Sequence, residues 1–189
     1  MEKTNRGILF TAVPVAIGAL LLGMLAPGTA LLGTQQATTD GVGPHGYVVV
    51  TVNRDGKEIY RHEDHNLITN AGKDFISAQI GSTSPGTNGA NYIALSSTTI
   101  TPAAGDTTLS GEITGSGLQR AQGTYAHTNG QNTFTVTRTF TATATVNNVQ
   151  SAGLFTASSG GTMMAENTFT AVSLANNDQL TITWTITLS

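Results

Sequence analysis

The chain has 189 residues, which is enough for one domain of ordinary size and an accessory segment. Only 10% of the residues are charged, and the net charge of −3 with just eight Lys and Arg argues against a nucleic-acid-binding protein. The chain contains no cysteine, which excludes disulfides and thiolate chemistry.

The first 33 residues differ from the rest of the chain. Lys3 and Arg6 precede an uncharged, mainly apolar run over residues 7–33, which is long enough to cross a bilayer. Three interpretations fit this pattern: a signal peptide cleaved after residues 28–30 (Gly-Thr-Ala), a retained membrane anchor, or a pilin-type leader cut just before Ile8. In each case, residues from 45 onward are expected outside the cytoplasm.

Residues 34–46 are polar, rich in glycine and without periodicity, which predicts a flexible linker. The linker could be a spacer that holds the head domain away from a membrane. It could also be an arm that reaches into a neighbouring subunit and completes its sheet.

The head domain is expected to span residues 47–189. Residues 47–52 form a short apolar run that predicts a buried strand. Asp55-Gly56 then predicts a tight hairpin turn, with residues 57–62 as the partner strand. One short helix is expected over residues 73–80, where apolar residues fit a helical period.

Turn-forming residues separate the remaining apolar segments of the head. Further strands are expected at residues 91–96, 118–126, 133–146, 152–157, 167–174 and 179–188. Eight or nine strands with turns at this spacing predict an all-β fold, an antiparallel β-sandwich or jelly roll with one short helix.

Two of these strands alternate threonine with other residues. Every odd position in 133–145 is threonine, and the same alternation recurs over residues 180–188. Because side chains on a strand alternate between its faces, the threonines should lie on one face and the apolar residues on the other. We expect the threonines to face solvent or a neighbouring subunit. We expect four other residues of these strands to lie in the core: Phe134, Phe140, Ile182 and Trp184.

Arg138 is the one charge on the apolar face of the first Thr-rich strand. It could pair with Glu112 or Glu166 beneath a loop, or it could lie in a subunit contact. Neither Thr-rich strand contains lysine or proline, the residues that usually protect an open sheet edge. We therefore expect at least one open edge here, although central strands would explain the same sequence.

Six short motifs follow one another along the head: residues 65–72 (HNLITNAG), 92–95 (YIAL), 109–113 (LSGEI), 151–155 (SAGLF), 161–164 (GTMM) and 178–184 (DQLTITW). In this order they resemble the β-sandwich domain of structural proteins of tailed phages and archaeal viruses. Similar heads also occur on secreted proteins of archaea and bacteria. The resemblance covers about residues 46–189 and implies a structural role. The N-terminal apolar segment departs from the viral tail pattern, which favours a cell-surface, pilus-like or membrane-enveloped-virion setting.

The densest polar cluster is residues 61–65 (RHEDH). Two His and two carboxylates could hold a divalent metal ion, but on a strand His62 and Glu63 face opposite ways while His65 shares the face of Glu63. A solvated strand end is the other interpretation. The sequence lacks a phosphate loop, a Gly-x-Ser-x-Gly elbow and an acidic calcium loop. We predict no catalytic, cofactor-binding or metal-binding residues, no cofactor and no small-molecule substrate.

These features favour a non-enzymatic, extracellular structural subunit that assembles with copies of itself into a filament, a pilus or a virion surface. The expected contacts are between copies, through head edges and the N-terminal segment, and with a membrane through residues 7–33 if they are retained. The alternative is a membrane-anchored, adhesin-like binding module. A third possibility is an exported hydrolase with an unrecognised site.

Overall fold

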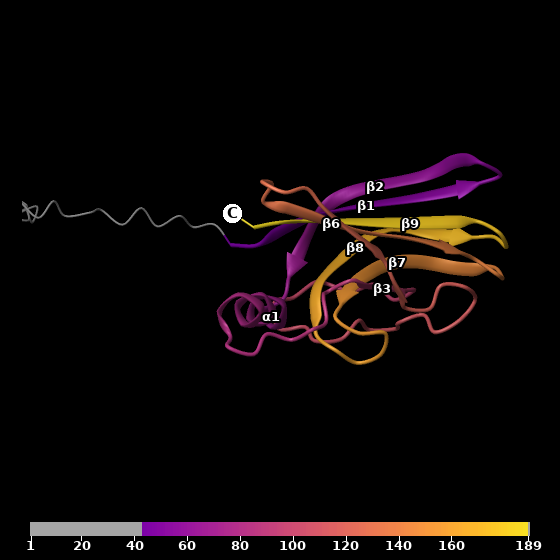
Figure 1. The fold of residues 1–189 in the computed structure, drawn as a ribbon. Helices are drawn as coiled ribbons and strands as arrows, with labels where there is room; N and C mark the ends of the chain where they lie inside the picture. Colours follow the sequence, from indigo (N-terminus) through magenta and orange to yellow (C-terminus); the bar gives the residue numbers. More distant parts are fainter. Residues whose placement is uncertain (1–42, 189) are drawn as a thin grey trace, which may run out of the picture. The chain divides into compact units, whose positions relative to one another are not determined.

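The computed structural model of the protein describes residues 43–188, which belong to a compact unit that spans Asp40–Ser189 (Figure 1). The expected leader or anchor at residues 1–33, and residues 34–42 of the expected linker, lie outside the described residues. Within residues 43–188, no helix has the length and apolar character needed to span a bilayer.

The described part of the chain forms nine strands and one helix, α1 (Asn70–Gly81). The strands are β1 (His45–Arg54), β2 (Lys57–Ile68), β3 (Tyr92–Ser96), β4 (Ala121–Gln122), β5 (Thr124–His127), β6 (Thr133–Thr141), β7 (Val146–Phe155), β8 (Met163–Leu174) and β9 (Gln179–Thr187). All strand pairs are antiparallel, in the order β4-β3-β7-β8-β2-β1-β9-β6-β5. The sheet folds over on itself as a sandwich, which confirms the predicted fold class (Figure 1).

Two segments pass from one half of the sandwich to the other. β2 pairs with β1 along most of its length and then with β8 at Leu67 and Ile68. Residues 121–127 make the second crossing, because β4 pairs with β3 whereas β5 pairs with β6. Gly123 lies between β4 and β5, where an added Cβ would be 2.8 Å from Cγ1 of Val136. The two ends of the strand order are thus joined through a single glycine.

The Thr-rich strands are central in the sheet, so the expected open edge is wrong for β9. β9 pairs with β1 on one side and with β6 on the other along its whole length. β6 also pairs with β5, over residues 134–137. Within β6 and β9, only Thr133 and residues 138–141 of β6 lack a second strand partner, and Arg138 lies within the longer of these stretches. A charge at an unpaired stretch discourages another strand from adding there.

The connection after β6 differs from the prediction. β6 ends at Thr141, because the backbone N–H of Ala142 leaves the sheet and donates to a carbonyl of the β8–β9 turn. β7 already begins at Val146. The turn expected at Asn147 and Asn148 is instead an irregularity inside β7, with a φ of 59° at Asn148. The Asp55-Gly56 turn is confirmed, with both residues at positive φ between β1 and β2.

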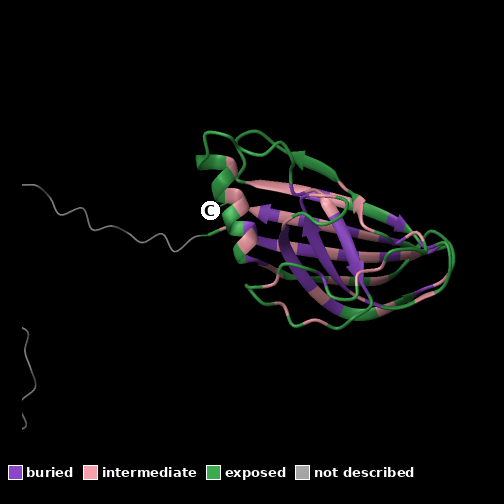
Figure 2. Ribbon diagram, turned by 90° about the horizontal axis from the view of Figure 1, so that it is seen from below, coloured by how far each residue is buried: buried purple, intermediate pink, exposed green. Residues whose placement is uncertain are grey.

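The alternation of β6 and β9 separates the core from the surface as predicted (Figure 2). Phe140, Ile182 and Trp184 are fully buried in the main core. Phe134 is only half-buried and packs against the edge of that core. On the opposite face, the threonines of the two strands are half-buried or exposed, and the hydroxyls of some pairs, such as Thr139 and Thr181 at 2.8 Å, hydrogen-bond across the ladder.

Candidate functional site

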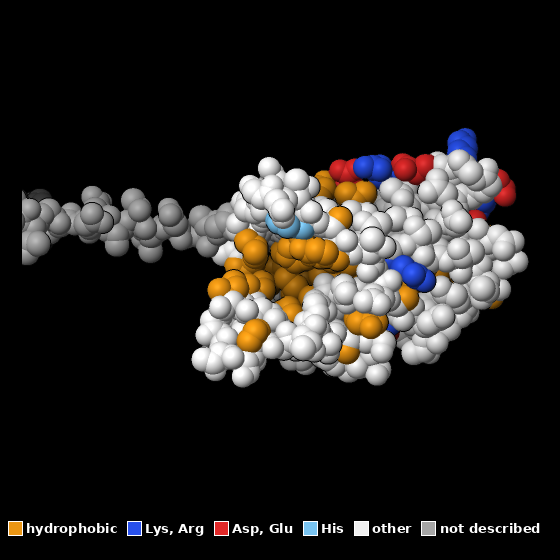
Figure 3. Space-filling model, in the orientation of Figure 1, with side chains coloured by type: hydrophobic (Ala, Val, Ile, Leu, Met, Phe, Trp, Pro, Cys, Tyr) orange, Lys and Arg blue, Asp and Glu red, His pale blue; other side chains and the backbone are white. Residues whose placement is uncertain are grey.

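An apolar groove opens at the end of the sandwich where β1 begins and β9 ends (Figure 3). Its volume is about 610 Å³, within the range of about 300–1,000 Å³ that is typical of binding pockets. Four large hydrophobic side chains are exposed in the described part of the chain, and three of them line this groove: Ile80 (76%), Tyr125 (56%) and Leu188 (42%). We call it the α1 groove; it is lined by Phe75, Ile76, Gln79, Ile80, Gly86, Thr87, Asn88, Gly89, Ala90, Asn91, Tyr125, Phe134, Met164 and Leu188.

One wall of the α1 groove is the helix, and its position is set by two residues at its start. The Thr69 hydroxyl accepts from the N–H of Gly72 (2.9 Å) and donates to the carbonyl of Met163 in β8 (2.6 Å). Gly72 lies directly against β8, because an added Cβ would be 2.2 Å from the carbonyl oxygen of Met164. The helix therefore begins at Asn70, three residues before the predicted start, and is held against β8.

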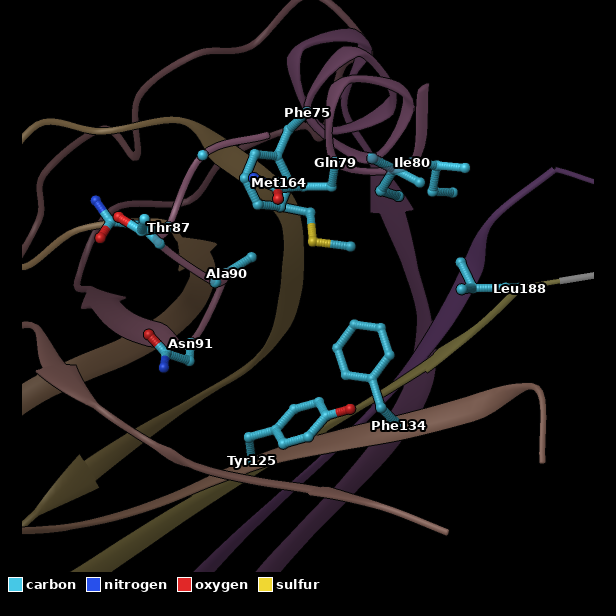
Figure 4. Close-up of a pocket in the computed structure, with 14 residues that line it drawn as sticks. Phe75, Gln79, Ile80, Thr87, Ala90, Asn91, Tyr125, Phe134, Met164 and Leu188 are labelled. Atoms are coloured by element: carbon cyan, nitrogen blue, oxygen red, sulfur yellow. The ribbon is translucent and has the colours of Figure 1, made fainter. Parts of the chain in front are cut away.

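The position of α1 directs its apolar residues into the groove. Phe75 and Ile76 are half-buried and pack against the main core. Phe75, Gln79 and Ile80 follow one another along the groove wall (Figure 4). Ile80 lies one residue before the end of the helix and is the most exposed of these side chains. It remains exposed because nothing in the described part of the chain covers it.

The opposite wall comes from β5, β6 and the residue after β9. The rings of Tyr125 and Phe134 are 5.6 Å apart between centroids, with a tilt of 39°. Tyr125 is opposite Val136 in the register, so it projects from the core-facing side of β5. Leu188 is held in place by its backbone N–H, which donates to the carbonyl of Asn132 (2.8 Å). The two walls face each other across an open space (Figure 4).

The remaining lining determines the chemistry of the groove. Met164 of β8 is buried and forms part of the floor, whereas Thr87 and Asn91 add a hydroxyl and an amide at one side (Figure 4). Asn88 is a further amide of the lining. None of the fourteen lining residues is Asp, Glu, His, Lys or Arg. The groove can therefore bind apolar groups and make neutral hydrogen bonds, but its own side chains include no carboxylate or imidazole for acid–base chemistry.

The polar cluster at residues 61–65 lies within β2, which continues to Ile68, so the expected strand end at residue 62 is wrong. Glu63 accepts hydrogen bonds from the Tyr47 hydroxyl (2.8 Å) and from Arg61. The hydrogen bond between Tyr47 and Glu63 is the main cause of two opposite shifts: it lowers the pKa of Glu63 and raises the pKa of Tyr47. His65 packs edge-on against Tyr47 on this face. His62 points to the other face, toward Phe169, so the two histidines are not brought together.

In the described residues, no group of three or more His, Asp or Glu is arranged to hold a metal ion. The charged side chains of β2 form a strip along the β1–β2 hairpin instead (Figure 3).

Arg138 pairs with neither predicted carboxylate, so that ion-pair prediction is wrong. Its guanidinium is exposed and reaches the carbonyl of Gln122 at 3.4 Å. Glu112 is bound by Arg120 instead, through two parallel N–H···O bonds. Arg120 also donates to two backbone carbonyls and stacks 3.6 Å above the ring of Phe155. Its role is to hold three segments of the chain together.

Glu166 is fully buried beside Asp106. The backbone N–H of Ala103 donates to both carboxyl groups, at 2.9 Å to Glu166 and 3.1 Å to Asp106. Burial raises the pKa of Glu166 to about 7, and the hydrogen bond with Asp106 acts in the same direction. Glu166 can therefore hold a proton up to near neutral pH.

Sequence reasoning missed the α1 groove because each of its residues is ordinary within its own element. Ile80 continues a helical pattern and Tyr125 fits a strand, so neither is unusual in the sequence. A signal existed only at Leu188, the last apolar residue of the alternation, which continues beyond the end of β9. The exposure of these residues depends on what the neighbouring elements leave uncovered.

Comparisons of the chain with family models, with curated proteins and with solved structures found no match.

Proposed function

We propose that the protein is a non-enzymatic, extracellular structural subunit that assembles with copies of itself into a filament, a pilus or a virion surface. The observation that carries this proposal is the α1 groove, which gathers three of the four exposed large hydrophobic side chains of the described residues at one end of the sandwich. A concentrated apolar surface on a head otherwise covered by hydroxyls, amides and a few charges is typical of a protein–protein contact.

The sequence outside the described residues supports the same proposal. Residues 7–33 carry no charge and are mainly apolar, so they need an apolar environment, either a membrane or another protein surface. The uncharged Thr-rich outer face adds a surface that can pack closely against another copy, because it carries no like charges that would repel. Both features favour dense assembly over free diffusion.

The second candidate is a membrane-anchored, adhesin-like binding module. The volume of the α1 groove supports this second candidate, because about 610 Å³ is also the size of a small-ligand site. Such a module would act singly and would have no reason to polymerise.

The two candidates differ in the behaviour of the full chain. We expect the purified full-length protein to form ordered polymers that are visible by negative-stain electron microscopy, with a mass by light scattering that grows with concentration. A full-length protein that stays monomeric at high concentration would contradict the structural-subunit proposal and favour the binding module.

A further inference from the structure

The α1 groove is an apolar surface whose occupant can be inferred from the chain itself. We propose that it binds the apolar segment of residues 7–33 from a second copy of the chain. This inference rests on the proposed function, because it names the contact by which one copy holds the next.

The first argument is chemical. All fourteen lining residues are uncharged, and the segment of residues 7–33 is uncharged as well. A charged peptide would lose hydration in this groove without gaining an ion pair, which disfavours acidic or basic partners. An apolar segment gains from burial against Phe75, Tyr125 and Leu188, which are all at least partly accessible to it.

The polar groups of the lining fit the same occupant. Gln79, Asn88 and Asn91 provide amides that can both donate and accept hydrogen bonds. A peptide segment needs such groups wherever its backbone N–H and C=O groups are not paired internally. A purely hydrocarbon ligand, such as an acyl chain, would leave these amides without use.

The second argument is position. The first residue of β1, His45, pairs with Thr187, and the next residue after Thr187, Leu188, lines the groove. The 42 residues that precede Gly43 therefore join the described part of the chain at this end of the sandwich. The ten residues from 34 to 43 can extend at most about 35 Å, at about 3.5 Å per residue. This length allows the apolar segment of one copy to reach the groove of an adjacent copy.

The occupant is assigned to a second copy because assembly requires an accessible apolar surface. If each groove bound the apolar segment of its own chain, the groove and the segment would both be covered and neither could contact another copy. The head would then present only Ile59 as an exposed large hydrophobic side chain among the described residues.

The absence of native cysteine permits a direct test. Two full-length variants, one with Ile80→Cys and one with Leu31→Cys, carry different tags, are mixed in detergent, and are oxidised after the detergent is removed. Because each chain has one cysteine, a disulfide between the two tags can only join two copies. We expect this mixed dimer from Ile80→Cys and not from the control Ile59→Cys, whose side chain is exposed (44%) but lies outside the groove.

A second measurement compares Ile80→Asp with Ile59→Asp in full-length chains. Both side chains are exposed, so both variants should melt within a few degrees of the wild type. We expect Ile80→Asp to raise the concentration needed for assembly about tenfold or more, and Ile59→Asp to leave it nearly unchanged.

The outcomes separate the two proposals. If the wild type polymerises but Ile80→Asp polymerises equally well and no mixed dimer forms, the groove inference is wrong and the structural-subunit proposal stands. If the wild type does not polymerise, the proposed function itself fails. A chain with both cysteines that forms an internal disulfide as a monomer would show that the segment binds its own groove, which would also overturn the inference.

Discussion

At the scale of single residues, two arginines that look alike in the sequence have different roles. Arg120 is nearly buried and satisfies its guanidinium through Glu112, two carbonyls and the ring of Phe155. Arg138 is exposed and makes one long hydrogen bond.

We expect Arg120→Met to lower the free energy of unfolding by about 3–5 kcal/mol, because it leaves Glu112 half-buried without its partner. The matched control, Arg138→Met, removes the same charge at an exposed site and should cost less than about 1 kcal/mol. Urea denaturation of both variants measures the difference. Equal losses would contradict the assignment of Arg120 as the structural arginine.

Glu166 makes stability depend on pH in a defined direction. Its pKa is raised from an ordinary value of 4.5 to about 7 in the folded protein, so the folded state holds the proton more tightly than the unfolded state. The stabilisation is fully present below about pH 4.5 and is lost as the pH rises toward about 7.

We therefore expect the melting temperature to fall by several degrees between pH 4.5 and pH 7. Glu166→Gln, which stays neutral, should flatten this profile, whereas the exposed Asp74→Asn should leave it unchanged. If Glu166→Gln keeps the wild-type pH profile, another group is responsible.

At the scale of elements, the start of α1 depends on a close approach between helix and sheet. Gly72 is in the first turn of the helix, where alanine would normally be the better residue by about 1 kcal/mol. The carbonyl of Met164 occupies the space that a methyl group would need.

We expect Gly72→Ala to destabilise the protein by at least about 2 kcal/mol, against the sign of helix propensity, because the helix must move away from β8. The control is Gly105→Ala, at a loop position where an added Cβ would meet no atom within 4 Å. Thermal unfolding of the two variants decides the matter, and a stabilising Gly72→Ala would show that the helix can shift freely.

At the scale of the whole molecule, the open strand edges of the described residues lie away from β9: residues 57–66 of β2 pair with β1 alone, and β4 and β5 end the strand order. β9 is paired on both sides, so strand addition along this Thr-rich strand is closed to a partner. The α1 groove gathers three of the four large hydrophobic side chains that are exposed in the described residues.

We expect the fragment of residues 43–189 to unfold cooperatively, at a temperature close to that of the head in the full chain, and to stay monomeric by light scattering. It contains the nine strands and the core of the described residues, but it lacks residues 7–33. The fragment begins at residue 43 and not at 47, because β1 already pairs with β9 at His45. Polymers of the fragment alone would show that head–head contacts are sufficient.

The sequence by itself determined the features that depend on neighbouring residues along the chain. The period of two in β6 and β9 predicted which side chains face the core, and burial of Phe140, Ile182 and Trp184 agrees. The Asp55-Gly56 turn was predictable because positive φ at two successive positions favours this pair. The fold class followed from the number of such local signals.

Only the tertiary structure decided which strands pair, which carboxylate each arginine binds, and where apolar residues remain exposed. Ile80, Tyr125 and Leu188 lie far apart in the sequence and belong to different parts of the fold, yet they line one groove. Periodicity indicates the face on which a side chain lies, but not whether another element covers that face. Coverage depends on contacts between distant segments, and these exist only once the chain has folded.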